Sequence, residues 1–101
     1  MSDAVITGVG VASAYGVGVE AFFAGLIGGQ SAVRPITGFD ARSFATHVGG
    51  EVPSPTPVQL RDRKTHLGLL AAQEAWQMAG CDRQAWLSLG VGLEQALLTD
   101  L

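Results

Sequence analysis

Residues 4–18 constrain the fold more than any other stretch, because they join an apolar run to a glycine-rich turn. Small and β-branched apolar residues fill most of the run from Ala4 to Val11. This pattern is typical of a strand that is buried on both faces between helices. Gly16 and Gly18 then give the backbone the freedom to turn. We therefore expect a buried strand over residues 4–11 that leads through a turn into a helix.

The first helix is expected from Val19 to Leu26 or Ile27. Its apolar residues recur at the spacing of a helix that faces a core. They are Val19, Phe22, Phe23, Leu26 and Ile27. Glu20 in the first turn suits the positive end of the helix dipole, and Gly28 with Gly29 predicts its end.

The second helix is expected from Asp62 or Thr65 to Ala79, with Gly80 ending it. A wide apolar face predicts that it packs under a sheet. This face consists of Leu67, Leu70, Ala71, Ala75, Trp76, Met78 and Ala79. Gly68 interrupts the good helix formers at a cost of about 1 kcal/mol relative to alanine, unless a close contact needs the space.

Residues 30–57 form an irregular excursion, because prolines and glycines interrupt any long helix. One edge-like strand is expected within residues 44–52, where side chains alternate between two faces. The prolines at 53, 55 and 57 indicate either a stiff connector or a polyproline ligand, and the connector is the commoner use of such a loop.

After the second helix, the apolar run from Leu87 to Leu93 predicts a second buried strand. Residues 94–101 then begin another apolar-rich helix. The chain therefore has the alternating strand and helix order of an α/β protein, in which a sheet packs against helices.

Length and composition indicate one domain whose core is incomplete. The chain has 101 residues, of which 48% are hydrophobic and 15% charged. This is rich in apolar residues for so short a chain, as expected of a segment that buries surface against something else. The net charge of −3 gives no general attraction to nucleic acid or to an anionic membrane.

The N-terminus and the cysteine content predict a cytoplasmic protein. Cys81 is the single cysteine, which excludes an internal disulfide and is compatible with a reducing compartment. Asp3 stands where a secretory signal would carry basic residues. The uncharged stretch from Ala4 to Val19 is 16 residues long, shorter than the roughly 18 that suggest a membrane-spanning helix.

The pair Gly8 and Gly10 after an apolar run permits a dinucleotide-binding interpretation, but two further requirements are missing. The third glycine of that motif would fall at Ser13. The acidic residue that holds a ribose hydroxyl would fall near residues 28–30, which are Gly-Gly-Gln. A dinucleotide-binding module remains the weaker alternative.

Several blocks in register resemble the opening segment of a β-ketoacyl-acyl-carrier-protein synthase. They are residues 5–13, 18–26, 29–37, Phe39-Asp40, residues 50–53, Asp62-Arg63, residues 67–75, Ala79-Gly80 and residues 89–92. The resemblance covers nearly the whole chain, while the chain covers only the first part of such an enzyme. It implies that residues 1–101 are one incomplete domain, part of a thiolase-like half with a mixed sheet packed by helices.

The resemblance also implies a reaction, the decarboxylative Claisen condensation of an acyl thioester with malonyl-carrier protein in fatty-acid or polyketide synthesis. A cysteine nucleophile and two histidines carry this chemistry in the family. All three lie downstream of this chain, so we expect no catalytic residue, no cofactor and no activity in the chain alone. Its expected partners are an acyl carrier protein and either the remainder of the synthase or a dimer partner. A short non-catalytic or structural subunit is the alternative.

The cysteine and the histidines of this chain do not match those catalytic positions. Cys81 follows a helix-ending glycine, whereas the family's nucleophile sits at a later strand-to-helix bend. His47 and His66 fall in an extended piece and at a helix start, and neither segment supplies the catalytic pair. His47 and His66 are 19 residues apart, and His66 and Cys81 are 15 residues apart. These separations fit no compact zinc spacing, so no metal site is expected.

One basic cluster is a candidate for carrier-protein docking: Arg61, Arg63 and Lys64, with His66 nearby. Carrier proteins are acidic, so a basic edge can attract them through long-range electrostatics. Asp62 dilutes the charge of this cluster. The alternative is an ordinary solvated helix N-terminus, which is the usual role of such charged runs.

Overall fold

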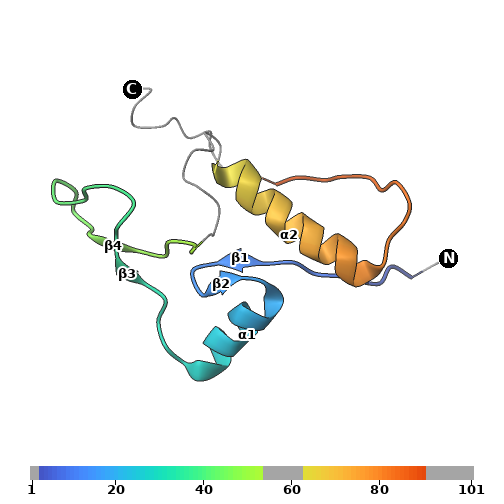
Figure 1. Ribbon diagram of the computed structural model, residues 1–101, viewed down its shortest axis with the longest axis horizontal. Helices are drawn as coiled ribbons and strands as arrows, with labels where there is room; N and C mark the ends of the chain where they lie inside the picture. The colour runs from blue at the N-terminus through green and yellow to red at the C-terminus, as the bar shows by residue number, and fades with distance from the viewer. Residues whose placement is uncertain (1–2, 54–62, 91–101) are drawn as a thin grey trace.

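The computed structural model describes residues 3–53 and 63–90. In this part of the chain, each of two helices follows a pair of two-residue strands (Figure 1). In order, the elements are β1 (Ala12–Ser13), β2 (Gly16–Val17), α1 (Val19–Gly28), β3 (Arg34–Pro35), β4 (Val48–Gly49) and α2 (Arg63–Ala79). The α/β class is confirmed. The strands of the described residues form two short antiparallel pairs, β1 with β2 and β3 with β4.

The β1–β2 hairpin reverses the chain through the turn that the glycines predict. Ala12 pairs with Val17, and Ser13 pairs with Gly16. Gly16 and Gly18 have φ angles of 135° and 117°, which side chains with a Cβ rarely adopt. The Gly18 N–H donates to the Val11 carbonyl at 2.8 Å and closes the base of the hairpin. The expectation for these two glycines is therefore confirmed.

The buried strand predicted over residues 4–11 is wrong in the described structure. These residues are extended but belong to no strand, and Val5 and Ile6 are 78% and 85% exposed. A strand needs the hydrogen-bonding groups of a neighbouring backbone, and helix α2 lies beside this segment instead (Figure 1).

The second buried strand is also wrong for residues 87–90, which have no regular structure and expose Leu87 and Leu89. No strand among the described residues pairs with them. Residues 91–93, the rest of this prediction, lie outside the described residues. The helix expected over residues 94–101 lies outside them as well.

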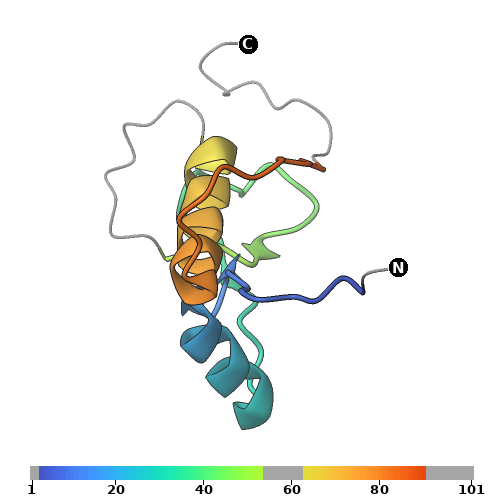
Figure 2. The ribbon, with the colours of Figure 1, turned by 90° about the vertical axis from the view of Figure 1, so that its right-hand side faces the viewer.

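Helix α1 begins at Val19 as predicted and ends at Gly28, one residue beyond the predicted Ile27, but its apolar stripe does not face a core. Gly29 ends the helix in the left-handed conformation with φ 70°, as the two glycines predict. No residue of α1 is buried, and Phe23 and Ile27 are 60% and 71% exposed. Figure 2 shows the reason: α1 extends away beyond α2 and does not pack alongside it.

Helix α2 confirms the second predicted helix and its end at Gly80, where φ is 63°. It lies across the N-terminal segment and the β1–β2 hairpin (Figure 1). The space beside Gly68 is open, because a Cβ added there would meet nothing within 4 Å. No close contact among the described residues therefore explains this glycine.

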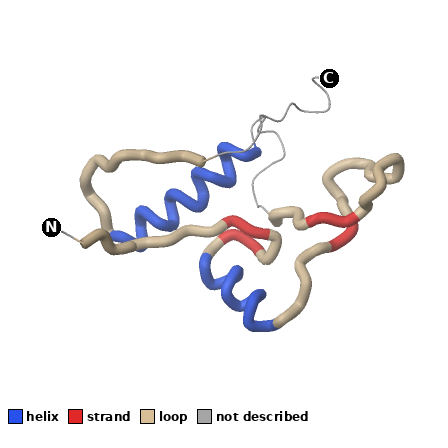
Figure 3. Tube along the Cα trace, turned by 180° about the vertical axis from the view of Figure 1, so that it is seen from behind, coloured by secondary structure: helices blue, strands red, loops and turns tan. Residues whose placement is uncertain are grey.

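The excursion forms a separate lobe, residues 34–51, around the β3–β4 pair (Figure 3). Its second strand is only Val48–Gly49, shorter than the strand expected within residues 44–52. Phe39 and Phe44 stack edge to face with centroids 5.8 Å apart. Ala41, next to them, is the only apolar side chain that is buried among the described residues. The prolines at 55 and 57 lie outside the described residues.

The residues that the structure describes do not close around a core of their own. The accessible surface of the chain is 8782 Å², whereas a compact monomer of this mass would expose about 5,400 Å². Its radius of gyration is 16.4 Å, against about 13 Å for a compact domain of this length. Within the described ranges, no helix is long and apolar enough to cross a membrane.

Candidate functional site

Two glycines of the N-terminal segment bring it against the backbone of α2. A Cβ on Gly8 would fall on the carbonyl oxygen of Ala75, and a Cβ on Gly10 would fall on that of Ala71. Neither glycine has a positive φ, so other residues could adopt the backbone conformation. Glycine is needed at these positions because a larger side chain would clash with α2. This packing accounts for the Gly8-x-Gly10 spacing without a bound nucleotide, because helix α2 fills the room beside both residues.

Glu74 of α2 connects three parts of the chain through one carboxylate. Its Oε1 accepts the Val11 N–H at 3.0 Å, and its Oε2 accepts the Val19 N–H at 2.9 Å. Val19 is the first residue of α1, and the Gly18 before it offers no side chain to cap the helix. Glu74 therefore satisfies a free N–H of α1 and places negative charge at the positive end of that helix.

Tyr15 holds the other end of α1 against the hairpin turn. Its hydroxyl donates to the Gln30 carbonyl at 2.6 Å, just after the helix ends. Its ring lies against Gly25, where a Cβ would overlap the ring atoms, and meets Phe22 edge to face at 6.4 Å. Sequence reasoning missed both Tyr15 and Glu74. For Glu74, the available signal was an acidic residue within the apolar face of α2.

Glu51, the last residue of the lobe, bonds the segment that follows β3. Its carboxylate accepts the Thr37 N–H at 2.8 Å, the Thr37 hydroxyl at 2.9 Å and the Gly38 N–H at 2.7 Å. These donors, with the Thr37 N–H first, lower the pKa of the Glu51 carboxyl below its ordinary value, and the charge of Arg63 acts in the same direction. The ionised carboxylate of Glu51 thus stabilises the contact between the two chain segments of the lobe.

The predicted docking cluster begins helix α2. Arg61 lies outside the described residues. The guanidinium of Arg63 donates from Nη2 to the Val52 carbonyl, so it turns toward the end of the lobe. Lys64 and His66 each have an interaction partner within the chain as well. Arg63 and Lys64 are therefore the first two residues of α2, and the Arg63 guanidinium is hydrogen-bonded to the Val52 carbonyl.

Cys81 and His47 occupy the places that the sequence indicates. Cys81 lies in the turn after α2, where its N–H donates to the Trp76 carbonyl and its thiol to the Arg83 carbonyl at 3.5 Å. His47 is exposed on the lobe, and its carbonyl accepts the Ile36 N–H at 2.9 Å. Among the described residues, no group of three or more metal-binding side chains comes together.

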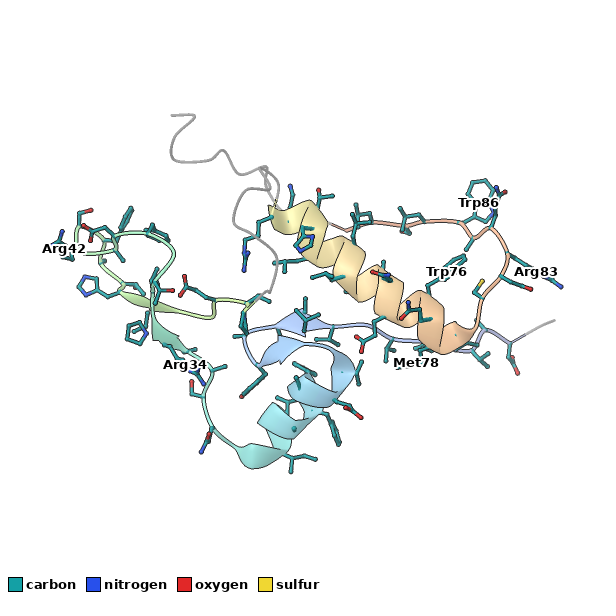
Figure 4. All side chains as sticks on the ribbon, viewed as in Figure 1. Arg34, Arg42, Trp76, Met78, Arg83 and Trp86 are labelled. Atoms are coloured by element: carbon teal, nitrogen blue, oxygen red, sulfur yellow. The ribbon has the colours of Figure 1, made fainter. Side chains whose placement is uncertain are left out.

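A shallow, open groove follows the face of α2 that points away from the N-terminal segment. It is lined by Leu69, Ala72, Gln73, Trp76 and Gln77. Figure 4 shows Trp76 on this side of the helix and Trp86 extending into solvent from the segment that follows. Trp76 is 44% exposed and Trp86 fully exposed, so neither is held in a pocket.

Comparisons with known proteins give one consistent result. Residues 1–97 match the family described as "Beta-ketoacyl synthase, N-terminal domain". The chain is 38% identical over 86 residues to the 3-oxoacyl-[acyl-carrier-protein] synthase 2 of Coxiella burnetii, covering 77% of this chain and 21% of that protein.

Two subunits of one Streptomyces glaucescens system are also similar. The tetracenomycin polyketide synthase ketoacyl synthase alpha subunit is 36% identical over 89 residues, which cover 80% of this chain and 21% of that protein. The beta subunit is 32% identical over 97 residues, 88% of this chain and 24% of that protein.

A solved structure agrees with the sequence matches. The ishigamide ketosynthase/chain length factor superposes with a TM-score of 0.64 at 41% identity, over 76% of this chain and 21% of that chain. The present chain therefore spans about a fifth of the length of the relatives it matches.

Proposed function

Because the chain belongs to the β-ketoacyl synthase family through its N-terminal domain, we propose that it is the N-terminal part of a synthase for fatty-acid or polyketide assembly. The match of residues 1–97 to that domain is the observation that carries this proposal. The incomplete core supports it, because Val5, Ile6 and three apolar residues of α1 (Phe23, Leu26 and Ile27) remain exposed. The rest of such a synthase would cover these apolar side chains. A cytoplasmic location fits this role.

The reaction of the whole protein would be a decarboxylative condensation. An acyl group first passes from its thioester to a cysteine sulfur, releasing the carrier thiol. Malonyl-carrier protein then loses CO₂, and the carbanion so formed attacks the acyl-enzyme carbonyl, forming a carbon–carbon bond and freeing the cysteine. None of Cys81, His47 and His66 matches a catalytic position of the family. The proposed contribution of this chain is therefore the scaffold held by Glu74 and by the glycines beside α2.

A chimera tests this proposal. The matched N-terminal segment of the Coxiella burnetii synthase is replaced by the corresponding residues of this chain, and condensation of an acyl thioester with malonyl-carrier protein is measured. We expect an active chimera and no activity from the 101-residue chain alone. The relative lacking its N-terminal segment is the negative control. A folded but inactive chimera, or turnover by the chain alone, would contradict the proposal.

We further propose that the basic cluster of Arg61, Arg63 and Lys64, of which Arg63 and Lys64 begin α2, attracts the acidic carrier protein. Reversing the charge at both Arg61 and Lys64 in the chimera should raise KM for the malonyl carrier. Exposed charges contribute up to about 1 kcal/mol each, so a rise of roughly tenfold is expected, and it should shrink at high salt. Arg42→Glu is the matched control, because Arg42 is 90% exposed on the lobe. Equal effects of the two changes would argue against docking at α2.

A second candidate role is a non-catalytic subunit that pairs with a catalytic synthase. The similarity to a ketoacyl synthase beta subunit, over 88% of this chain, favours it. The structural relative is likewise titled a ketosynthase/chain length factor. Two chimeras separate these roles. In one, the chain replaces the matching N-terminal segment of the tetracenomycin alpha subunit, and in the other it replaces that of the beta subunit. Activity restored only in the beta subunit would favour the second role.

A further inference from the structure

Among the described residues, Glu51 and Val52 are held by two different elements, Glu51 by the lobe and Val52 by helix α2. From the lobe, the N–H groups of Thr37 and Gly38 and the hydroxyl of Thr37 hold the Glu51 carboxylate. From the helix, Arg63 donates to the carbonyl of the adjacent Val52. Two consecutive residues are thus bonded to two elements that are far apart in the sequence.

The charges at this junction are complementary. The bonds from Thr37 and Gly38 are the main causes that lower the pKa of Glu51, and the positive charge of Arg63 adds a smaller contribution in the same direction. Within the lobe itself, Arg42 is paired with Asp40 at 2.7 Å in the same loop. The contact of Arg42 is therefore local to one loop of the lobe. Arg63, in contrast, belongs to helix α2 and contacts Val52, the residue that follows the lobe.

We propose that Arg63 is a positioning residue that couples the start of α2 to the lobe through Val52 and Glu51. The hydrogen bond to Val52 fixes the backbone next to Glu51, and the positive charge favours the carboxylate form that accepts the three bonds from Thr37 and Gly38. The lobe and the helix N-terminus then shift together. This role differs from that of a surface cation that only attracts a partner, and it does not require a carrier protein.

The coupling is tested by amide hydrogen exchange at Thr37 and Gly38 in the 101-residue chain. Arg63→Ala should speed exchange at both amides on the order of tenfold, since a charge-assisted network loses one member. Glu51→Gln should speed them at least as much. Arg63→Lys keeps a donor and the charge, so it should restore most of the protection. Arg42→Ala is the matched control and should leave both amides unchanged.

Three results would overturn the inference. Unchanged exchange at Thr37 and Gly38 in Arg63→Ala would show that the lobe closes without the helix. A failure of Arg63→Lys to restore protection would show that neither the donor nor the charge matters. Equal acceleration at Gly18, whose N–H is bonded to Val11 at the base of the β1–β2 hairpin, would show a general loss of structure and not a local coupling. None of these measurements involves a carrier protein, so they are independent of the proposed function.

Discussion

Gly10→Ala is expected to detach helix α2 from the N-terminal segment. The added Cβ would overlap the carbonyl oxygen of Ala71 and come within 2.7 Å of its carbonyl carbon. Backbone atoms of a helix cannot move aside as a flexible side chain can, so the helix must shift as a whole. Overpacking of this kind costs about 3 kcal/mol. A shift of α2 would also break the bonds of Glu74 to Val11 and Val19.

Far-UV circular dichroism measures this effect. An isolated helix of 17 residues is marginal in water, so α2 should lose much of its helical signal once its packing is lost. Gly68→Ala is the matched control, because it adds the same methyl group to open space on α2. It should increase helicity, with a gain of about 1 kcal/mol. Changes of the same sign in the two variants would contradict the packing described for Gly10.

Glu74→Leu should release the start of α1 and the N-terminal segment from helix α2. The change leaves the Val11 and Val19 N–H groups without their acceptor and removes the negative charge from the start of α1. A hydrogen bond to a charged group contributes about 1.5–3 kcal/mol. We therefore expect exchange at these two amides to accelerate by at least tenfold. Glu74→Gln, which retains one acceptor oxygen, should give an intermediate result.

Glu20→Gln separates the effect of the hydrogen bonds from that of charge. Glu20 also lies in the first turn of α1, so its neutralisation removes a favourable interaction with the helix dipole. It should change exchange at Val11 little, since that amide is bonded to Glu74. If Glu20→Gln accelerated Val11 as much as Glu74→Leu does, charge alone would explain the result and the bridging role would be wrong.

Local sequence signals predicted the helices well. Glycines after periodic apolar residues gave the ends of α1 and α2, because a left-handed residue at Gly29 or Gly80 is a local requirement. The same reasoning gave the turn at Gly16 and Gly18. The strands could not be predicted equally well, because a strand depends on a partner that may be remote in sequence. Residues 4–11 have strand composition, yet no described strand pairs with them.

The polar contacts of the site were harder to foresee. Glu74 and Val11 are 63 residues apart in sequence, and no local pattern joins them. The two glycines at 8 and 10 were visible, but their partners Ala71 and Ala75 follow only from the way the helix crosses the segment. Arg63 and Lys64 begin a helix as the sequence predicts, while the bond from Arg63 to the Val52 carbonyl could be found only in the structure.

Amide hydrogen exchange over residues 4–9 of the free chain tests most directly whether its core is completed by other residues. We predict fast exchange there, because this segment has no strand partner among the described residues and Val5 and Ile6 face solvent. Val11 and Val19, bonded to Glu74, should exchange more slowly. Slow exchange throughout residues 4–9 in a monomeric chain would contradict the account, since it would show a strand that is already paired and buried.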